Sequence, residues 1–203
     1  LGRLDADGSL AASFALHGVP LSATAGPTVV AIALQTDGRI VVAGNFIYTN
    51  NGTRGSIARL QADGSLDASF AVSLGLLRPS VAQDSYATLA IQPDGKIIVG
   101  GYFIEGLPGS ATPILRLNSD GSRDATFNVE QSPGSGLWAC EFSAFSNIRA
   151  LALQPDGKIV VAGNLEPRDQ SGTFLFARLN TNGSRDPSFA TTFGTNALGF
   201  AIR

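Results

Sequence analysis

The stretch "LQPDGKIVVAGN", residues 153–164, decides the fold because the chain contains it in three versions. The other two read "LQTDGRIVVAGN" at residues 34–45 and "IQPDGKIIVGGY" at residues 91–102. A catalytic motif is normally needed once, whereas a segment repeated at near-even spacing is usually architecture. We therefore expect these residues to specify a repeated structural unit.

A second cassette alternates with the first and is centred on another Asp-Gly or Asn-Gly pair. Its copies are "LDADGSLAASF", "LQADGSLDASF", "LNSDGSRDATF" and "LNTNGSRDPSF", which begin at residues 4, 60, 117 and 179. By subtraction, their last residues, Phe14, Phe70, Phe127 and Phe189, are 56, 57 and 62 positions apart. A period this long, with several strand signals in each unit, is typical of propeller blades rather than helical solenoids.

Each cassette predicts a β-hairpin, because an Asp-Gly or Asn-Gly turn lies between apolar runs. The expected turn residues are Asp37, Gly38, Asp94, Gly95, Asp156 and Gly157 in the first cassette, and Asp63, Gly64, Asp120, Gly121, Asn182 and Gly183 in the second. Two hairpins per unit predict a four-stranded antiparallel sheet. No stretch has a sustained helical period with caps, so we expect almost no helix.

The strand after the first turn is apolar on both faces. Ile159 and Val161 point one way, and Val160 and Ala162 point the other. The strands of a sheet with one solvent-exposed face would alternate apolar and polar residues. These strands must therefore be covered by other protein segments on both faces. Stacked blades provide that cover, and a sandwich does not explain the period. The predicted fold class is an all-β propeller of four-stranded antiparallel blades, with about three complete blades and partial terminal units.

The two cassettes together resemble the delta-60 repeat, as in "IALQTDGRIVVAGNF" (residues 32–46) followed by "IARLQADGSLDASF" (residues 57–70). The departures from the shared pattern are Ala11 for Asp, Thr36 for Pro, Leu165 for Phe and Asn182 for Asp. The resemblance implies a β-propeller from a bacterial, secreted or cell-surface multidomain protein. It implies no activity common to the family.

The chain is predicted to be a single propeller domain or propeller fragment over residues 1–203. The expected units cover about residues 1–16 (partial), 29–70, 87–127, 148–189 and 196–203 (partial). The two partial units could together complete a fourth blade and close the ring. We favour an incomplete arc, because residues 196–203 offer one strand at most.

Composition excludes several classes of protein. The net charge is −2 and the basic residues form no run or stripe, so we expect no nucleic-acid partner. No apolar run reaches the roughly 18 residues of a membrane span. The single cysteine, Cys140, excludes an internal disulfide and a multi-cysteine metal site.

The loops predict where a ligand would bind. In a four-stranded meander the uniform Asp-Gly turns lie on one side. The varied second turns (residues 46–56, 103–113 and 165–174) and the link at residues 129–147 lie on the other. Binding residues tend to lie on varied loops of a rigid scaffold. The candidate ligand-binding residues are Trp138, Glu141, Tyr48, Asn50, Tyr102, Glu105, Arg168 and Asp169. The alternative is that these are surface loops with Trp138 as a local packing plug.

The recurring charged residues favour structure over chemistry. We expect Asp67, Asp124 and Asp186 to bond backbone N–H groups of their own hairpins, with weak calcium binding as the alternative. No other cofactor and no metal site is expected. The recurring arginines are predicted to pair with the recurring aspartates, with a phosphate or carboxylate funnel as the alternative. These arginines are Arg3, Arg59, Arg116 and Arg178.

Catalytic motifs are missing from the sequence. His17 has no nucleophile motif nearby, and Cys140 has no convincing base beside it. The sequence therefore favours a non-catalytic propeller module that is structural or binds a glycan or protein through its varied loops. Two alternatives stay open. One is a polysaccharide-active enzyme that uses a carboxylate pair drawn from Glu105, Glu141, Glu166 and Asp169. The other is a self-assembling ring or filament subunit that joins copies through open terminal strand edges.

Overall fold

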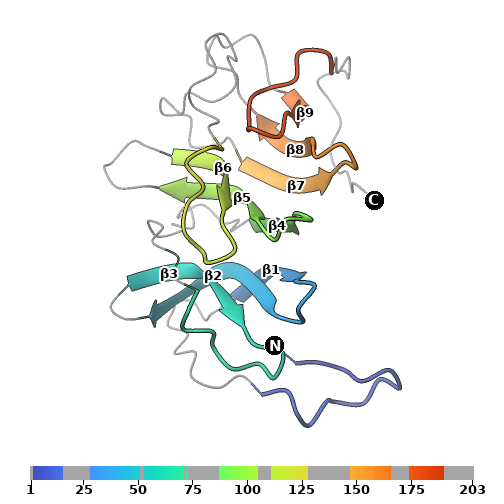
Figure 1. Ribbon diagram of the computed structural model, residues 1–203, viewed down its shortest axis with the longest axis vertical. Helices are drawn as coiled ribbons and strands as arrows, with labels where there is room; N and C mark the ends of the chain where they lie inside the picture. The colour runs from blue at the N-terminus through green and yellow to red at the C-terminus, as the bar shows by residue number, and fades with distance from the viewer. Residues whose placement is uncertain are drawn as a thin grey trace.

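The computed structural model describes residues 2–15, 28–50, 53–70, 72, 87–104, 111–127, 147–165 and 174–189. These residues form nine β-strands in three antiparallel sheets, and the strand order within each sheet follows the sequence (Figure 1). No helix among them is long and apolar enough to cross a membrane. The all-β prediction is confirmed.

Each repeat unit supplies one sheet. The first sheet contains β1 (Thr28–Leu34), β2 (Ile40–Asn50) and β3 (Thr53–Leu60). The second contains β4 (Ala87–Ile91), β5 (Ile97–Ile104) and β6 (Ala111–Leu117). The third contains β7 (Asn147–Leu153), β8 (Ile159–Leu165) and β9 (Phe174–Leu179).

The Asp-Gly turns close the hairpins as predicted. In the second unit, the Gln92 N–H donates to the Lys96 carbonyl, and the Asp94 carboxylate accepts the Lys96 N–H at 3.1 Å. Gly95 has a φ of 83°, a left-handed conformation that glycine adopts without a Cβ penalty. The same two-residue signal therefore fixes the same turn in every unit.

A single isolated bridge replaces the predicted fourth strand in each described sheet. After each third strand the chain turns back at the second cassette, which we call the outer hairpin. It then forms one isolated bridge, as in Leu117 with Arg123. The chain then turns again, because the Asp124 side chain accepts the N–H of Thr126 and the Phe127 N–H donates to the Asp124 carbonyl. Each described sheet thus has three strands and one bridge instead of four strands. This turn at residues 124–127 hydrogen-bonds the backbone groups that a longer strand would have paired.

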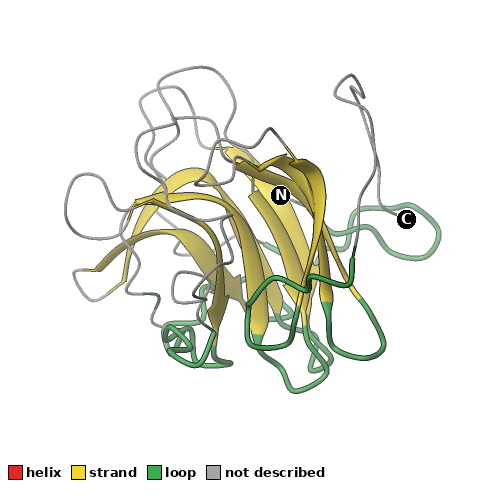
Figure 2. Cartoon of the chain, turned by 90° about the horizontal axis from the view of Figure 1, so that it is seen from above, coloured by secondary structure: helices red, strands yellow, loops and turns green. Residues whose placement is uncertain are grey.

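The three sheets follow one another along the long axis of the molecule (Figure 1). Strand β4 packs on β1, and β7 packs on β4 and β5. Most of the described turns lie along one rim of this arrangement (Figure 2). Among the described strands, the first and third sheets share no contact. The sheets therefore form an open arc, as the partial units predicted.

The core lies between the sheets and covers both faces of the middle one. Ile97, Ile98 and Val99 are consecutive, point to alternate faces and are all fully buried. Ile97 and Val99 belong to the cluster shared with the first sheet, and Ile98 belongs to the cluster shared with the third. At Gly100 an added Cβ would lie 2.8 Å from a methyl carbon of Ile148 on β7. Such close approach explains the small residues at the crowded centre.

The first strand of the first sheet has one uncovered apolar face. Val30, Ile32 and Leu34 of β1 are exposed, although all three are large and apolar. No described sheet packs on that side of β1. The predicted two-sided cover concerned the strand after the first turn, and it holds at β5. The uncovered face of β1 is a feature that the sequence did not predict.

Replacing Phe127 by alanine tests the packing between the second and third sheets. Phe127 is buried in their shared cluster, so we expect the substitution to lower the free energy of unfolding by about 3–5 kcal/mol. Urea denaturation followed by circular dichroism measures the loss. The control is Leu10→Ala at an exposed site, which should change stability by about 0.5 kcal/mol or less. Equal effects of the two substitutions would contradict this packing.

Candidate functional site

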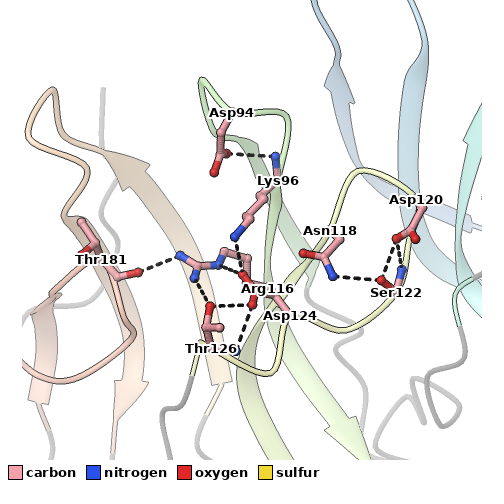
Figure 3. A network of polar contacts seen from close by, with 9 residues as sticks. All are labelled: Asp94, Lys96, Arg116, Asn118, Asp120, Ser122, Asp124, Thr126 and Thr181. Atoms are coloured by element: carbon pink, nitrogen blue, oxygen red, sulfur yellow. Dashed lines mark hydrogen bonds and ion pairs between the residues drawn. The ribbon is translucent and has the colours of Figure 1, made fainter.

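A cluster of charged side chains repeats in each unit and is drawn for the second unit in Figure 3. Arg116, next to the end of β6, donates from Nε to Oδ2 of Asp124 at 2.7 Å. Lys96, which precedes β5, donates from Nζ to the same oxygen at 2.8 Å. Asp124 is 4% exposed, so its charge is buried and compensated by two cations.

The other carboxylate oxygen of Asp124 holds the turn that ends the outer hairpin. Oδ1 accepts the backbone N–H of Thr126 at 2.9 Å and its hydroxyl at 2.6 Å. An aspartate that bonds the backbone two residues further on is typical of an Asx-turn. Both oxygens are therefore occupied, and the prediction that these aspartates bond their own hairpins is confirmed.

The same arginine also holds the neighbouring unit. Leu117 packs toward the first sheet, so strand alternation turns Arg116 toward the third unit. Its Nη1 donates to the Thr181 carbonyl at 2.7 Å, and the guanidinium lies 4.8 Å from the centre of the Phe127 ring. One guanidinium thus contacts its own hairpin, an aromatic ring and the next unit. We call this arrangement the arginine latch.

The latch recurs along the chain. Arg59 binds Asp67 through Nε at 2.7 Å and donates from Nη1 to the Ser119 carbonyl. Arg3 donates from Nη1 to the Ala62 carbonyl at 3.1 Å. In all three cases the acceptor is the residue before the Asp-Gly or Asn-Gly pair of the next unit. The predicted pairing of arginine with aspartate is confirmed for Arg59, Arg116 and Arg178. It does not extend to Arg3, whose hairpin has Ala11 at the aspartate position. The bond between units is an addition that the sequence did not reveal.

The cations that assist the latch differ between units. In the third unit Lys158 donates to Asp186 at 2.9 Å, and Arg178 donates to the same carboxylate at 2.9 Å. In the first unit Arg39 replaces the lysine, and its Nε lies 3.8 Å from Oδ2 of Asp67. A cation after each first turn therefore supports a carboxylate in the outer hairpin of its own unit.

These contacts lower the pKa values of the recurring aspartates. Burial alone would raise the pKa of Asp124, but hydrogen bonds from Lys96, Thr126 and Arg116 outweigh it and hold the pKa well below its usual range. The pKa of Asp67 is lowered in the same way by Ser69 and Arg59, against the effect of burial. These carboxylates stay ionised across the physiological range.

The arginine latch can hold a hairpin and a neighbouring unit, and its geometry is poorly suited to acid–base catalysis. A general base needs a carboxylate that is free to accept a proton, whereas both oxygens of Asp124 are hydrogen-bonded. Within the described part of the chain, no three His, Cys, Asp or Glu side chains gather as metal ligands. The arginine latch is therefore a structural contact that holds units together.

A groove lies on the turn rim between the first and second units, with a volume of about 350 Å³. Gln35 and Gln92 line it from the two first turns, together with Arg39 and Asp120. The side-chain oxygens of Gln35 and Gln92 are buried without a hydrogen-bond donor, and the equivalent oxygen of Gln154 is in the same state. The loop variation did not predict the groove, because the groove lies on the side of the uniform turns. The signal for it was the glutamine that recurs before each first turn.

The predicted ligand-binding residues lie mostly outside the described structure. Tyr48, Asn50 and Tyr102 lie within strands β2 and β5, since pairing of Asn50 with Thr53 extends the first sheet beyond the expected loop boundary. The remaining candidates fall outside the described residues: Trp138, Glu141, Glu105, Arg168 and Asp169. The same holds for Glu166, Cys140 and His17. A shared site for these residues stays a prediction.

Replacing Asp124 by asparagine tests the latch. The substitution removes the charge that two cations compensate, so we expect the free energy of unfolding to fall by about 3 kcal/mol at neutral pH. Because the pKa of Asp124 is depressed in the folded state, its stabilisation is present above the unfolded pKa of about 4 and is lost as pH falls below it. The difference between wild type and variant should therefore shrink in acid.

Urea titrations between neutral pH and about pH 2 measure this difference. The matched control is Asp94→Asn in an exposed first turn, which should cost about 1 kcal/mol or less. A stability difference for Asp124→Asn that stays constant through the acid range would show that the ionised carboxylate is not what stabilises the hairpin.

A protein-family model agrees with this architecture. A model described as a domain of unknown function (DUF5122) beta-propeller matches residues 35–70, 92–127 and 154–189. The chain matches no curated protein. Among solved structures it is similar to the crystal structure of a protein of unknown function from Bacteroides caccae, at 12% identity and a TM-score of 0.35, over 92% of this chain and 75% of that one. Because the family model matches more than half of the chain, the chain belongs to the DUF5122 β-propeller family.

Proposed function

We propose that this chain is a non-catalytic propeller module that presents varied loops to a glycan or protein partner. The observation that carries the proposal is the use of the recurring charges. In the second unit Lys96 and Arg116 both donate to Asp124, and Arg116 also donates to the neighbouring unit. Residues that repeat are thus engaged in holding the scaffold. Specific recognition then falls to residues that do not repeat.

The side of the module opposite the Asp-Gly turns carries those non-repeating residues. In an antiparallel sheet the connection from the second to the third strand lies at the end opposite the first turn. Trp138, Tyr48 and Tyr102 are the aromatic candidates that we predict for this side, and flat aromatic rings suit stacking on sugars or on protein side chains. Glu105, Glu141 and Arg168 would add directional hydrogen bonds.

A binding screen with matched variants tests this proposal. The full chain is applied to a glycan array and used to capture proteins, and the affinity of each ligand found is measured for Trp138→Ala. We expect that substitution to weaken binding by at least about tenfold, because aromatic anchors dominate binding energy. The control is Pro155→Ala, an exposed turn-rim position outside the groove, and circular dichroism tests that both variants fold.

The groove on the turn rim is the second candidate location for a ligand. It is favoured by the buried, unsatisfied oxygens of Gln35 and Gln92. Asp120→Asn changes its lining without touching the varied side. Binding that survives Trp138→Ala and is lost in Asp120→Asn would place the ligand in the groove and overturn the loop-side proposal.

A further inference from the structure

The groove on the turn rim is lined by residues at which one copy of the repeat departs from another. Residues 34–45 of the first unit and residues 153–164 of the third unit agree at ten of twelve positions. The two differences are Thr36 in place of a proline and Arg39 in place of a lysine. Thr36 and Arg39 both line the groove between the first and second units. A cassette that differs from its copy only where it lines a groove indicates that the groove has a use of its own.

Arg39 keeps hydrogen-bond donors available in this groove. Its Nη1 lies 3.5 Å from Oδ2 of Asp37, and its Nε lies 3.8 Å from Oδ2 of Asp67. Both distances exceed the range of about 2.7–3.2 Å that is usual for an N–H···O hydrogen bond. Lys96 and Lys158, at the same position in the other units, reach their aspartates at 2.8 Å and 2.9 Å. The guanidinium of Arg39 can therefore still bind a carboxylate through two parallel hydrogen bonds.

Asp120 brings a negative charge to the groove from the second unit. Its Oδ1 accepts the backbone N–H of Ser122 at 2.8 Å and the hydroxyl at 2.7 Å (Figure 3). Its Oδ2 has no hydrogen-bond donor among the described residues. The hydrogen bonds from Ser122 and the charge of Arg59 lower the pKa of Asp120, so it is ionised at neutral pH. The equivalent residue of the third unit is Asn182, so this carboxylate distinguishes the groove from the equivalent place between the second and third units.

Two glutamines in the lining carry acceptors without donors. Gln35 is 8% exposed, and the Oε1 atoms of Gln35 and Gln92 are buried without a hydrogen-bond partner. The terminal amide torsion of glutamine is soft, so each oxygen can turn to accept an N–H group from a molecule in the groove. Such a bond would remove the cost of an unpaired buried acceptor. Gln154 is unpaired as well, so the glutamines are the general part of the site, whereas Arg39 and Asp120 are specific to it.

The charges of the lining favour a ligand that is neutral overall and carries both signs. Asp37 and Asp120 balance Arg39 and Arg59, so the formal charge of the lining is zero. A divalent cation would face two guanidinium groups, and a phosphate group would face two carboxylates, so neither suits the groove. None of the described residues that line it is aromatic, so the ring on which a sugar would stack is missing. A zwitterion is the class of small molecule that matches these charges.

We propose that this groove binds a short peptide in its zwitterionic form, with the C-terminal carboxylate on Arg39 and the N-terminal ammonium group on Asp120. The backbone N–H groups of such a peptide match the unpaired oxygens of Gln35 and Gln92. Ile91, which also lines the groove, offers an apolar contact for a peptide side chain. The volume of about 350 Å³ lies at the lower end of the roughly 300–1,000 Å³ of small-molecule sites, which suits a dipeptide. This site is additional to the loop-side function and does not rest on it.

The dipeptide alanyl-leucine serves as the probe, and isothermal titration calorimetry with the full chain should give saturable one-to-one binding. Arg39→Lys and Asp120→Asn should each weaken binding by at least about tenfold, because each removes a charge-assisted hydrogen bond. Both substitutions introduce a residue that another unit already carries at that position, so the fold should be retained. Lys158→Arg makes the reverse exchange outside the groove and should bind as the wild type does. Circular dichroism tests that all three variants fold.

Modified dipeptides locate each end of the ligand and provide a test on the unaltered chain. The C-terminal amide lacks the carboxylate, so it should bind more weakly and be insensitive to Arg39→Lys. The N-acetyl derivative lacks the ammonium group, so it should bind more weakly and be insensitive to Asp120→Asn. Free leucine carries both charges without a peptide N–H group and should bind at least about tenfold more weakly than the dipeptide. Maltose and inorganic phosphate should show no saturable binding at the same concentrations.

Three kinds of result would overturn the proposal. The first is no saturable binding of the dipeptide at millimolar concentration. The second is an affinity that neither substitution in the groove changes, or that is the same for the dipeptide, its amide and its N-acetyl derivative. The third is binding of leucine, maltose or phosphate at least as tight as that of the dipeptide. Because none of these measurements involves Trp138 or the varied loops, failure here leaves the proposed loop-side function untouched.

Discussion

The guanidinium groups of Arg59 and Arg116 each make contacts in three directions, and the arrangement of the sheets depends on these contacts. Arg116 binds Asp124 in its own outer hairpin, stacks on Phe127 and donates to the carbonyl of Thr181 in the next unit. Its planar fork suits several simultaneous hydrogen bonds, which the point charge of a lysine ammonium cannot reproduce. The outer turn, the ring beneath it and the neighbouring unit are therefore positioned by one side chain.

Apolar stacking and the latch contribute different things to the fold. Burial of Ile98, Val161 and Phe127 between the second and third sheets supplies a driving force that is large and non-directional. Such a core by itself would permit the sheets to slide against one another. The latch costs desolvation of a buried carboxylate, which its hydrogen bonds offset, and in return it fixes one register between units. Repetition of both features in successive units produces the arc.

The division between repeated and unrepeated residues also bears on function. The repeated charges are taken up by the scaffold, so they are poorly suited to bind a ligand specifically. The pairing of Arg59 with Asp67 could be predicted because both residues recur at fixed spacing within one hairpin. The bond from Arg59 to Ser119 could not, since it joins residues of different units and depends on how two sheets stack. The groove beside Gln35 and Gln92 arises from the same stacking.

The sequence by itself determined the units, their turns and the two-sided apolar strands, because these depend on local φ preferences and on side-chain alternation. It also predicted an outer strand after each third strand. The structure has one bridge there, since Asp124 captures the backbone of Thr126 and redirects the chain. The sequence favoured an open arc, and only the tertiary structure decided that Ile32 and Leu34 face solvent at its first sheet. Sheets cover one another across long sequence separations, and no local pattern states whether a given face has a neighbour.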